Sequence, residues 1–461
     1  MSTFRHQYNP IPNDSGQSEE IPLVSFKRKP IRRICQCPHF VLAEIGEKEK
    51  LQPSHPRFGP FYREDESEVS GKKAAWDKIL EKSPDNKNKT LESYLSAMRR
   101  IEKEARDAYG GDKILYNYNL TQSEFRWMMI QDGCFFLLLA LLILGVSPNQ
   151  LGYPDKHIIF GKKDNEEDVK RWIESMFFVG NQIPLVVLNE LMKQSFLQAI
   201  VQRVKNWEIP SDLSKKILYN LLVLPALEYA NNQVTITSPL PVDLLDALHR
   251  LMIGPGDLIS MDLVENETTE DDLEAGAEKG YSKGDISISA TELSKKGIHF
   301  GIVEEGGCTE IDFKDYFLFP RLYLPTFTVD DDTELLCKSL KYYEISQKHC
   351  NGEGKMSQVM RSYLQFMNDL ICTYEDVKIL EKRGIIRANN PYTKEKLPMM
   401  LNKLAGKDKK TTTHKLHMLR IKLRDYNIAP WEKFKIVAIL LFVFTVIQTF
   451  LAALSYIKPP K

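Results

Sequence analysis

The sequence predicts a mainly α-helical fold, with a large helical domain, a small antiparallel β segment at about 286–329 and one C-terminal transmembrane helix. Three observations predict it: apolar residues recur at steps of three and four along most of the chain, β-rich runs are confined to one region, and residues 436–457 carry no charge. With 461 residues, of which 43% are hydrophobic, the chain can bury a large core.

Composition divides the chain into successive segments. We expect a disordered tail at 1–30, a helical domain at 31–400 with a mobile acidic loop at 265–280, a basic juxtamembrane segment at 401–435, the transmembrane helix at 436–457 and a short tail at 458–461. The 62 basic and 62 acidic residues balance, so we expect no nucleic-acid partner. The first twenty residues contain no apolar run, so we expect no secretory signal there.

The region at 31–62 is rich in proline and aromatic residues, which favours an ordered, irregular segment packed on the helices. Cys35, Cys37 and His39 resemble part of a metal site, but no second Cys or His pair follows nearby, so we expect no zinc or other metal. The seven cysteines are odd in number and scattered, mostly in apolar segments. We therefore expect reduced thiols.

Helical spacing begins at 72–108 and resumes at 121–144, where Thr121 and Glu124 have the spacing of a capping box. The apolar run at 134–146 is too short to span a bilayer, and a longer window includes Asp132, which is costly in lipid. We interpret this segment as a central core helix. A second membrane segment is the alternative.

A long helical pattern follows at 165–200, and Pro184 predicts a break at 181–183 because proline removes a backbone donor. Asn181 and Gln182 have side chains able to satisfy the freed backbone groups. Further apolar-periodic segments lie at 213–229 and 242–252. The acidic stretch at 265–280 has no core face and is either a solvated loop or a docking site for a basic partner.

Short alternating runs at 286–329 predict strands, with Gly306 and Gly307 as a turn. Asp331 and Glu334 then predict a capped helix through Tyr343. Helical spacing returns at 358–380.

The stretch at 436–457 would form a helix of roughly 33 Å, against a hydrocarbon core of roughly 30 Å. Aromatic and basic residues mark both of its ends, as is typical of membrane interfaces. The interface residues that we expect are Trp431, Lys433, Lys435, Tyr456 and Lys458. A buried helix of a large soluble core is the alternative, although such helices are usually shorter and carry polar residues.

The position of this stretch favours a tail anchor, inserted in the plasma membrane or an endomembrane as a single pass. More basic residues precede the stretch than follow it, so the charge bias predicts that the N-terminal domain is cytosolic. The preceding basic residues are Lys415, Arg420, Lys422, Arg424, Lys433 and Lys435. This run either binds anionic lipid head groups or forms a solvated helix face.

One face of the predicted span carries mostly small or polar residues at alternating steps of three and four. Such a face lets two helices approach closely, so a homodimer through the transmembrane helix is a hypothesis; a lipid-facing stripe is the alternative. The residues concerned are Ala438, Leu441, Thr445, Gln448, Ala452 and Ser455.

Motifs of common enzymes are absent from the sequence. It has no Gly-x-Ser-x-Gly elbow, no phosphate-binding Gly-x-x-x-x-Gly-Lys loop, no His-Glu-x-x-His pair and no dinucleotide fingerprint after a strand. We therefore name no catalytic, cofactor-binding or metal-binding residue, and expect no cofactor. An active site of unfamiliar arrangement is the alternative.

Eight segments in order resemble the plant family known as domain of unknown function 247, as does the final apolar stretch. These segments are RFGPFY (57–62), IEKEARDAYG (101–110), MMIQDGCFFLLLAL (128–141), NQIPLVVLNEL (181–191), DLLDALHRLM (243–252), SATELSKKGIHF (289–300), LYLPTFTVDDDTE (322–334) and FMNDLICTYEDVKILEKRGII (366–386). Gly180 departs from the family, which usually has Glu at that position.

The resemblance implies a mostly helical plant protein with a C-terminal membrane anchor and no established reaction. It also implies that some grass relatives lie at self-incompatibility loci and are proposed to act in recognition between pollen and stigma. We favour a non-enzymatic, membrane-anchored interaction or signalling protein with an unidentified protein partner. A self-incompatibility determinant and an uncharacterised enzyme are the alternatives.

Overall fold

The computed structural model describes most of the chain, and its described part is mainly helical, as the sequence predicts. The described residues are 32–35, 56–62, 66–143, 146–161, 172, 175–203, 241–253, 288–303, 307–308, 310–316, 319–329, 333–350, 358–388, 391–405, 414–426 and 430–457. The tail at 1–30, the helical pattern at 213–229, the acidic loop at 265–280 and the tail at 458–461 lie outside these residues.

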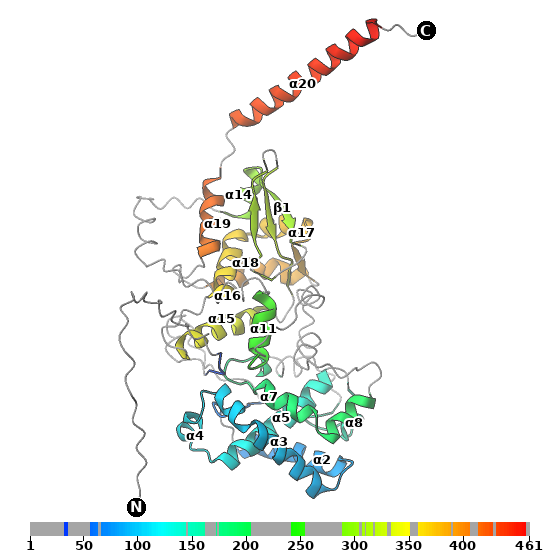
Figure 1. The fold of residues 1–461 in the computed structure, drawn as a ribbon, viewed down its shortest axis with the longest axis vertical. Coiled ribbons are helices and arrows are strands. Elements are labelled where there is room, and N and C mark those ends of the chain that lie inside the picture. Colours follow the sequence, from blue (N-terminus) through cyan, green and yellow to red (C-terminus); the bar gives the residue numbers. More distant parts are fainter. Residues whose placement is uncertain are drawn as a thin grey trace, which may run out of the picture.

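The first group of helices packs around α5, at the end of the molecule away from the C-terminal helix (Figure 1). Helices α2, α3 and α7 contact α5 directly, and α3 also contacts α7. The elements of this group are α2 (Glu66–Lys82), α3 (Lys87–Ala108), α4 (Lys113–Asn117), α5 (Gln122–Ile143), the 3-10 helix η1 (Pro148–Leu151), α7 (Leu185–Met192) and α8 (Ser195–Arg203).

Helix α5 is the core helix that the sequence predicts. Its capping box is formed: the Thr121 amide donates to Glu124 Oε2 at 2.8 Å, and the Glu124 amide donates to Thr121 Oγ1 at 3.2 Å. Side chains around its whole circumference are buried from Phe135 to Leu141. A helix that is apolar on every side is stable in water only when other elements surround it, and here the neighbouring helices do so.

The predicted break before α7 is present. Residues 181–184 are not helical, and α7 begins directly after Pro184. Asn181 Nδ2 donates to the Ser175 carbonyl at 2.9 Å, and Gln182 Nε2 donates to the Met176 carbonyl at 2.6 Å. The two amide side chains thus bond to backbone carbonyls at the break between the helices, as the sequence predicts.

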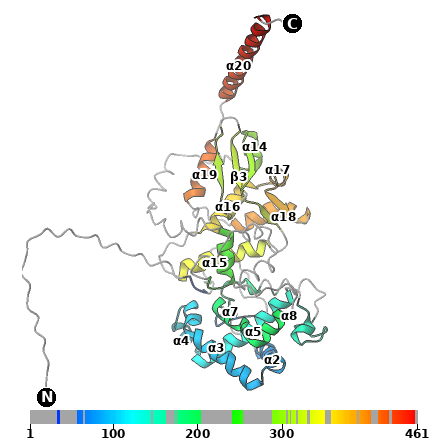
Figure 2. The same ribbon diagram turned by 45° about the vertical axis from the view of Figure 1, so that its right-hand side comes forward.

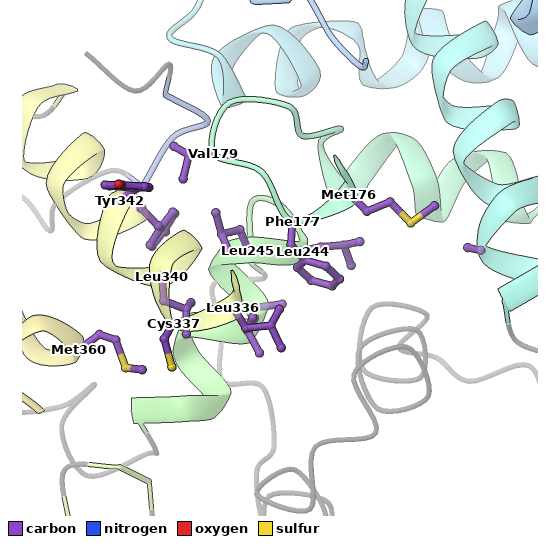
Figure 3. Close-up of a cluster of buried hydrophobic side chains, with 14 of the residues drawn as sticks. Met176, Phe177, Val179, Leu244, Leu245, Leu336, Cys337, Leu340, Tyr342 and Met360 are labelled. Atoms are coloured by element: carbon purple, nitrogen blue, oxygen red, sulfur yellow. The ribbon is translucent and has the colours of Figure 1, made fainter. Parts of the chain in front are cut away.

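The second group of elements continues the same hydrophobic core. Figure 3 shows the junction, where Phe177 lies beside Leu244 of α11 and Val179 lies near Tyr342 of α15, all within one cluster of buried residues. The helices of this group are α11 (Leu244–Ile253), α14 (Ala290–Lys295), α15 (Thr333–Cys350), α16 (Val359–Leu370), α17 (Tyr374–Lys382), α18 (Pro391–Ala405) and α19 (His414–Asp425).

The predicted β segment at 286–329 contains strands from His299 onward, but Ala290–Lys295 within it forms helix α14, and the expected antiparallel arrangement is only partly correct. Strands β1 (His299–Ile302), β2 (Asp312–Lys314) and β3 (Arg321–Leu324) form a sheet of order β1-β3-β2. Strand β3 is antiparallel to β2 but parallel to β1. The amide of Cys308 donates to the Met252 carbonyl of α11, so the chain after β1 leaves the sheet instead of turning back beside it.

A second, two-stranded sheet pairs β4 (Phe327–Val329) with β5 (Ile386–Ala388) in parallel. We predicted no strand near 386. Helices α15, α16 and α17 lie between the two strands in sequence, so no local turn signal indicates this pairing. Helix α15 also continues beyond the predicted Tyr343 to Cys350, and the pattern at 358–380 is two helices separated at Thr373.

The fold brings together two of the cysteines that the sequence predicts to be reduced thiols. Cys35 and Cys350 are placed to form a disulfide, with Cα atoms 6.4 Å apart and 315 positions apart in sequence. The fold brings them together because the Arg33 amide donates to Gln347 Oε1 at 3.1 Å, which fixes the segment 32–35 beside the end of α15. Sequence spacing carries no signal of such a distant pair. Cys37 and His39 lie outside the described residues.

The last two helices have opposite surroundings. Leu416 and Leu423 of α19 are buried against the body, so the predicted juxtamembrane stretch at 401–435 contains packed structure up to Tyr426. Helix α20 (Pro430–Ile457) extends away from the body (Figures 1 and 2). Its side chains from Val437 to Leu454 are all exposed.

Candidate functional site

Helix α20 is the candidate membrane site. It is long and apolar enough to cross a bilayer, and none of the stretch Val437–Leu454 is buried. Two of its hydroxyl groups bond within the helix: Thr445 Oγ1 donates to the Leu441 carbonyl and Thr449 Oγ1 to the Thr445 carbonyl, each at 2.7 Å. Internal bonding of this kind is what a hydrocarbon environment requires, because lipid tails accept no hydrogen bonds.

The residues that we predicted for the membrane interface fall at both ends of this helix. Trp431, Lys433 and Lys435 lie in its first two turns, and Tyr456 lies in its last turn. Lys458 lies outside the described residues. The interface role of these residues remains a prediction.

The small and polar stripe also lies on α20. Ala438, Leu441, Thr445, Gln448 and Ala452 are exposed, and Ser455 follows in the same helix. Because the Thr445 hydroxyl donates to the backbone of its own helix, the Gln448 amide has the larger capacity to bond across a helix pair. Dimerisation through this stripe remains a hypothesis.

The second apolar helix, α5, has different surroundings. Its stretch Gln122–Leu142 is also long and apolar enough to cross a bilayer, but most of it is buried inside the protein. Asp132 on this helix accepts from Lys72 Nζ at 2.6 Å and from the Gly59 amide at 2.7 Å. These contacts make α5 the centre of the helical body.

A buried polar network around Asp246 is the first candidate for chemistry. Its carboxylate accepts from Arg250 Nη2 at 2.8 Å, from the Tyr343 hydroxyl at 2.9 Å and from the Val242 amide at 2.9 Å. Arg32 Nη1 lies 2.5 Å from the same carboxylate. Three elements therefore meet there: the segment 32–35, α11 and α15.

Two neighbouring carboxyls in this network have opposite pKa shifts. Burial alone would raise the pKa of Asp246, but the positive charges of Arg32 and Arg250 lower it to about 2. Burial raises the pKa of Asp243 to about 7, and the negative charge of Asp246 adds to this effect. Asp243 Oδ1 accepts the Asp246 amide at 2.7 Å, so Asp243 caps the start of α11.

A second buried pair lies one turn further along α11. His249 Nε2 is 2.8 Å from Glu344 Oε1, and both side chains are fully buried. Glu344 also accepts from the amides of Met360 and Arg361 at 2.7 and 3.2 Å. The carboxylate thus holds the start of α16 against α15. Acid or base chemistry requires contact with a substrate, and neither side chain of the pair reaches the surface.

Sequence reasoning assigned no role to this network. The spacing of Asp246 and Arg250, four apart on a mostly apolar helix, is the available signal, because such a pair on a buried face implies an internal ion pair. Arg32, Tyr343 and Glu344 are distant in sequence and give no local signal. Within the described residues, no group of three His, Cys, Asp or Glu side chains is arranged to hold a metal ion.

The chain was compared with protein families, curated proteins and solved structures. No curated protein and no solved structure matches it. The sequence model of one family, described as plant protein of unknown function, matches residues 34–457, which is nearly the whole chain from the first buried segment to the end of α20. The chain therefore belongs to the plant family called domain of unknown function 247.

Proposed function

We propose that this protein is a membrane-tethered, non-enzymatic interaction or signalling protein, in which α20 spans the bilayer and the helical body presents a surface to a protein partner. The observation that carries the proposal is the fully exposed apolar stretch Val437–Leu454. An exposed apolar surface of this size is unfavourable in water, and a bilayer is the environment that matches its length and its internal bonding.

The non-enzymatic part of the proposal is supported by how the buried ionisable groups are used. Asp132, Asp246 and Glu344 each accept a backbone amide and a side-chain donor or buried histidine. Groups with such partners join elements of the fold together and have no free face for a substrate. We therefore assign them to stability.

We further propose that the body lies on the cytosolic side, because basic residues are concentrated before the span and the charge bias sets orientation. The redox state of the Cys35–Cys350 pair gives an independent readout of this choice. Disulfides are rare in the cytosol, so on this side we expect the pair to be kept as thiols. In an oxidising compartment the pair would be bonded.

Alkaline carbonate extraction of membranes that contain the full chain tests the tether. The wild type should remain in the pellet. A variant with Leu440→Arg, Phe444→Arg and Ile447→Arg should move to the supernatant, because each Arg at a helix centre costs about 3 kcal/mol on insertion. The matched control places one Arg at Tyr116, an 89% exposed position on α4, and should stay in the pellet. Release of the wild type by carbonate would refute the tether.

A further inference from the structure

The outer face of the three-stranded sheet carries a row of basic side chains. The strand register places His299 opposite Arg321 and Lys314 opposite Arg321, so the three residues lie side by side across β1, β3 and β2. Alternate residues such as Phe313 and Leu322 are buried beneath the sheet. We call His299, Arg321 and Lys314 the basic row.

The two permanent charges of the basic row, on Lys314 and Arg321, lie directly opposite one another. Like charges directly opposite one another destabilise a sheet. Within the described residues, Lys314 and Arg321 form no ion pair, and they lie 5.3 and 5.9 Å from the centroid of the Tyr323 ring. Two carboxylates lie nearby: Asp315 accepts the Tyr426 hydroxyl at 2.7 Å, and Asp312 lies two residues before Lys314 on the same face of β2, opposite Tyr323. An external anion beside Lys314 and Arg321 would reduce the repulsion between these two cations.

Exposed aromatic side chains flank the basic row at the same end of the sheet. Tyr316 follows β2 and is 50% exposed, and Phe319 precedes β3 and is 60% exposed. The Phe319 ring lies 6.0 Å from the His299 ring, between centroids. Aromatic rings next to Lys and Arg are the composition that residues at a membrane interface share.

The end of the sheet that carries the basic row lies next to the N-terminal end of α20. The Tyr426 ring packs on Phe313 with centroids 5.1 Å apart, and Lys296 Nζ donates to the Arg424 carbonyl at 2.6 Å. Helix α20 begins at Pro430, four residues after Tyr426. Four extended residues span at most about 14 Å. Figures 1 and 2 both show this sheet at the end of the body from which α20 departs.

We infer that the basic row, with Tyr316 and Phe319, docks on anionic lipid head groups of the bilayer that α20 spans. The inference rests on the proposed tether and adds a second attachment point to it. Because α20 keeps the body at the membrane, a weak contact is sufficient to hold the docked state. Docking restricts the rotation of the body about α20. Helix α4, at the end of the body away from α20, then faces the aqueous phase (Figure 1).

Hydrogen–deuterium exchange of the full chain in lipid nanodiscs tests this inference. One set of discs contains phosphatidylcholine alone, and the other contains 30% phosphatidylserine. Amides of 310–324 should exchange more slowly in the discs with phosphatidylserine. Lys314→Gln with Arg321→Gln should lower the ratio of docked to undocked molecules about thirtyfold, which at 1.4 kcal/mol per tenfold matches about 1 kcal/mol for each cation removed. Tyr316→Ser with Phe319→Ser should also weaken the protection.

The control variant is Lys113→Gln with Tyr116→Ser, which removes an exposed cation and an exposed aromatic residue from α4. It should keep the full effect of phosphatidylserine. Unchanged exchange in α5 shows that each variant is folded. Equal exchange in both kinds of disc, with the protein still integrated, overturns the docking while leaving the tether intact. If the protection from exchange depends on the number of protein chains per disc and not on the lipid, it arises from contact between copies of the protein. That result would also overturn the docking.

Discussion

Lys72 and Asp132 form a buried ion pair at 2.6 Å between α2 and α5, with side chains only 7% and 5% exposed. The second oxygen of Asp132 accepts the Gly59 amide, and Lys72 also donates to the Arg57 carbonyl. One pair therefore connects the segment 56–62 to two helices of the core.

The first prediction concerns this pair. Asp132→Leu should destabilise the protein by about 3–5 kcal/mol, because it leaves the Lys72 charge buried without a partner. The double variant Asp132→Leu with Lys72→Met should recover much of that loss, since no charge is then stranded. Denaturation of the full chain in detergent, followed by tryptophan fluorescence, to which the core residues Trp76 and Trp127 contribute, measures both. Equal losses in the single and double variants would contradict the assignment.

The second prediction is a pH dependence from Asp243. Its pKa is raised from 3.8 to about 7 in the folded state, so the folded protein retains a proton that the unfolded chain releases between these values. The contribution of the protonated Asp243 to the free energy of unfolding is therefore fully present below pH 4 and is lost as the pH rises towards 7. Asp243→Asn should be more stable than the wild type at pH 7.5, by at most about 4 kcal/mol, and equal to it near pH 4.

Asp246→Asn is the contrasting variant for this measurement. The pKa of Asp246 is lowered to about 2, so its stabilising charge is present above pH 4 and is lost as the pH falls towards 2. This variant should be less stable than the wild type at pH 7.5, and the difference should shrink in acid. Urea denaturation from pH 2 to pH 8 provides the comparison. Parallel profiles for all three proteins would show that neither carboxyl has the proposed environment.

The third prediction concerns Gly59, whose φ of +72° lies in the left-handed region. A Cβ atom there would lie 2.8 Å from the Tyr109 hydroxyl oxygen and 3.2 Å from the Gln182 carbonyl oxygen. Gly110 is the matched control, because its φ is +101° but a Cβ atom would meet nothing within 4 Å. Gly59→Ala should lower the melting temperature by several degrees more than Gly110→Ala, for an added cost of about 1–3 kcal/mol. Similar shifts in melting temperature for the two variants would mean that the close approach of Gly59 to Tyr109 and Gln182 does not affect stability.

The fourth prediction concerns self-association through α20. Gln448→Leu together with Thr445→Leu should abolish association in a membrane two-hybrid assay, because the stripe then has no side-chain amide to share with a second helix. Thr449→Leu is the control. Its hydroxyl bonds within its own helix and it is not part of the stripe, so association should persist. Unchanged association of the double variant would assign the stripe to a lipid-facing role.

The sequence was sufficient to predict features that depend on neighbouring residues. The capping box at Thr121, the break before Pro184 and the apolar helix α5 all follow from local chemistry, and the structure confirms them. The exposed apolar helix α20 follows from composition alone. In each case the signal and the structure involve residues within a few turns of each other.

Features that join distant segments were not predictable in this way. The parallel pairing of β1 with β3, the proximity of Cys35 and Cys350 and the contact of Arg32 with Asp246 each depend on how the whole core packs. The buried network at α11 was missed for the same reason, since Tyr343 and Glu344 reach it from another helix. Periodicity shows that a helix has a buried face but does not identify what covers it.

Protease protection in sealed microsomes, with a tag at each end of the full chain, tests the central claim most directly. If α20 spans the bilayer with the body on the cytosolic side, protease should remove the N-terminal tag and leave the C-terminal tag intact until detergent is added. Cys35 and Cys350 should then react with an alkylating reagent without prior reduction. A protected N-terminal tag, with both cysteines reactive only after reduction, would contradict the account and place the body in an oxidising compartment.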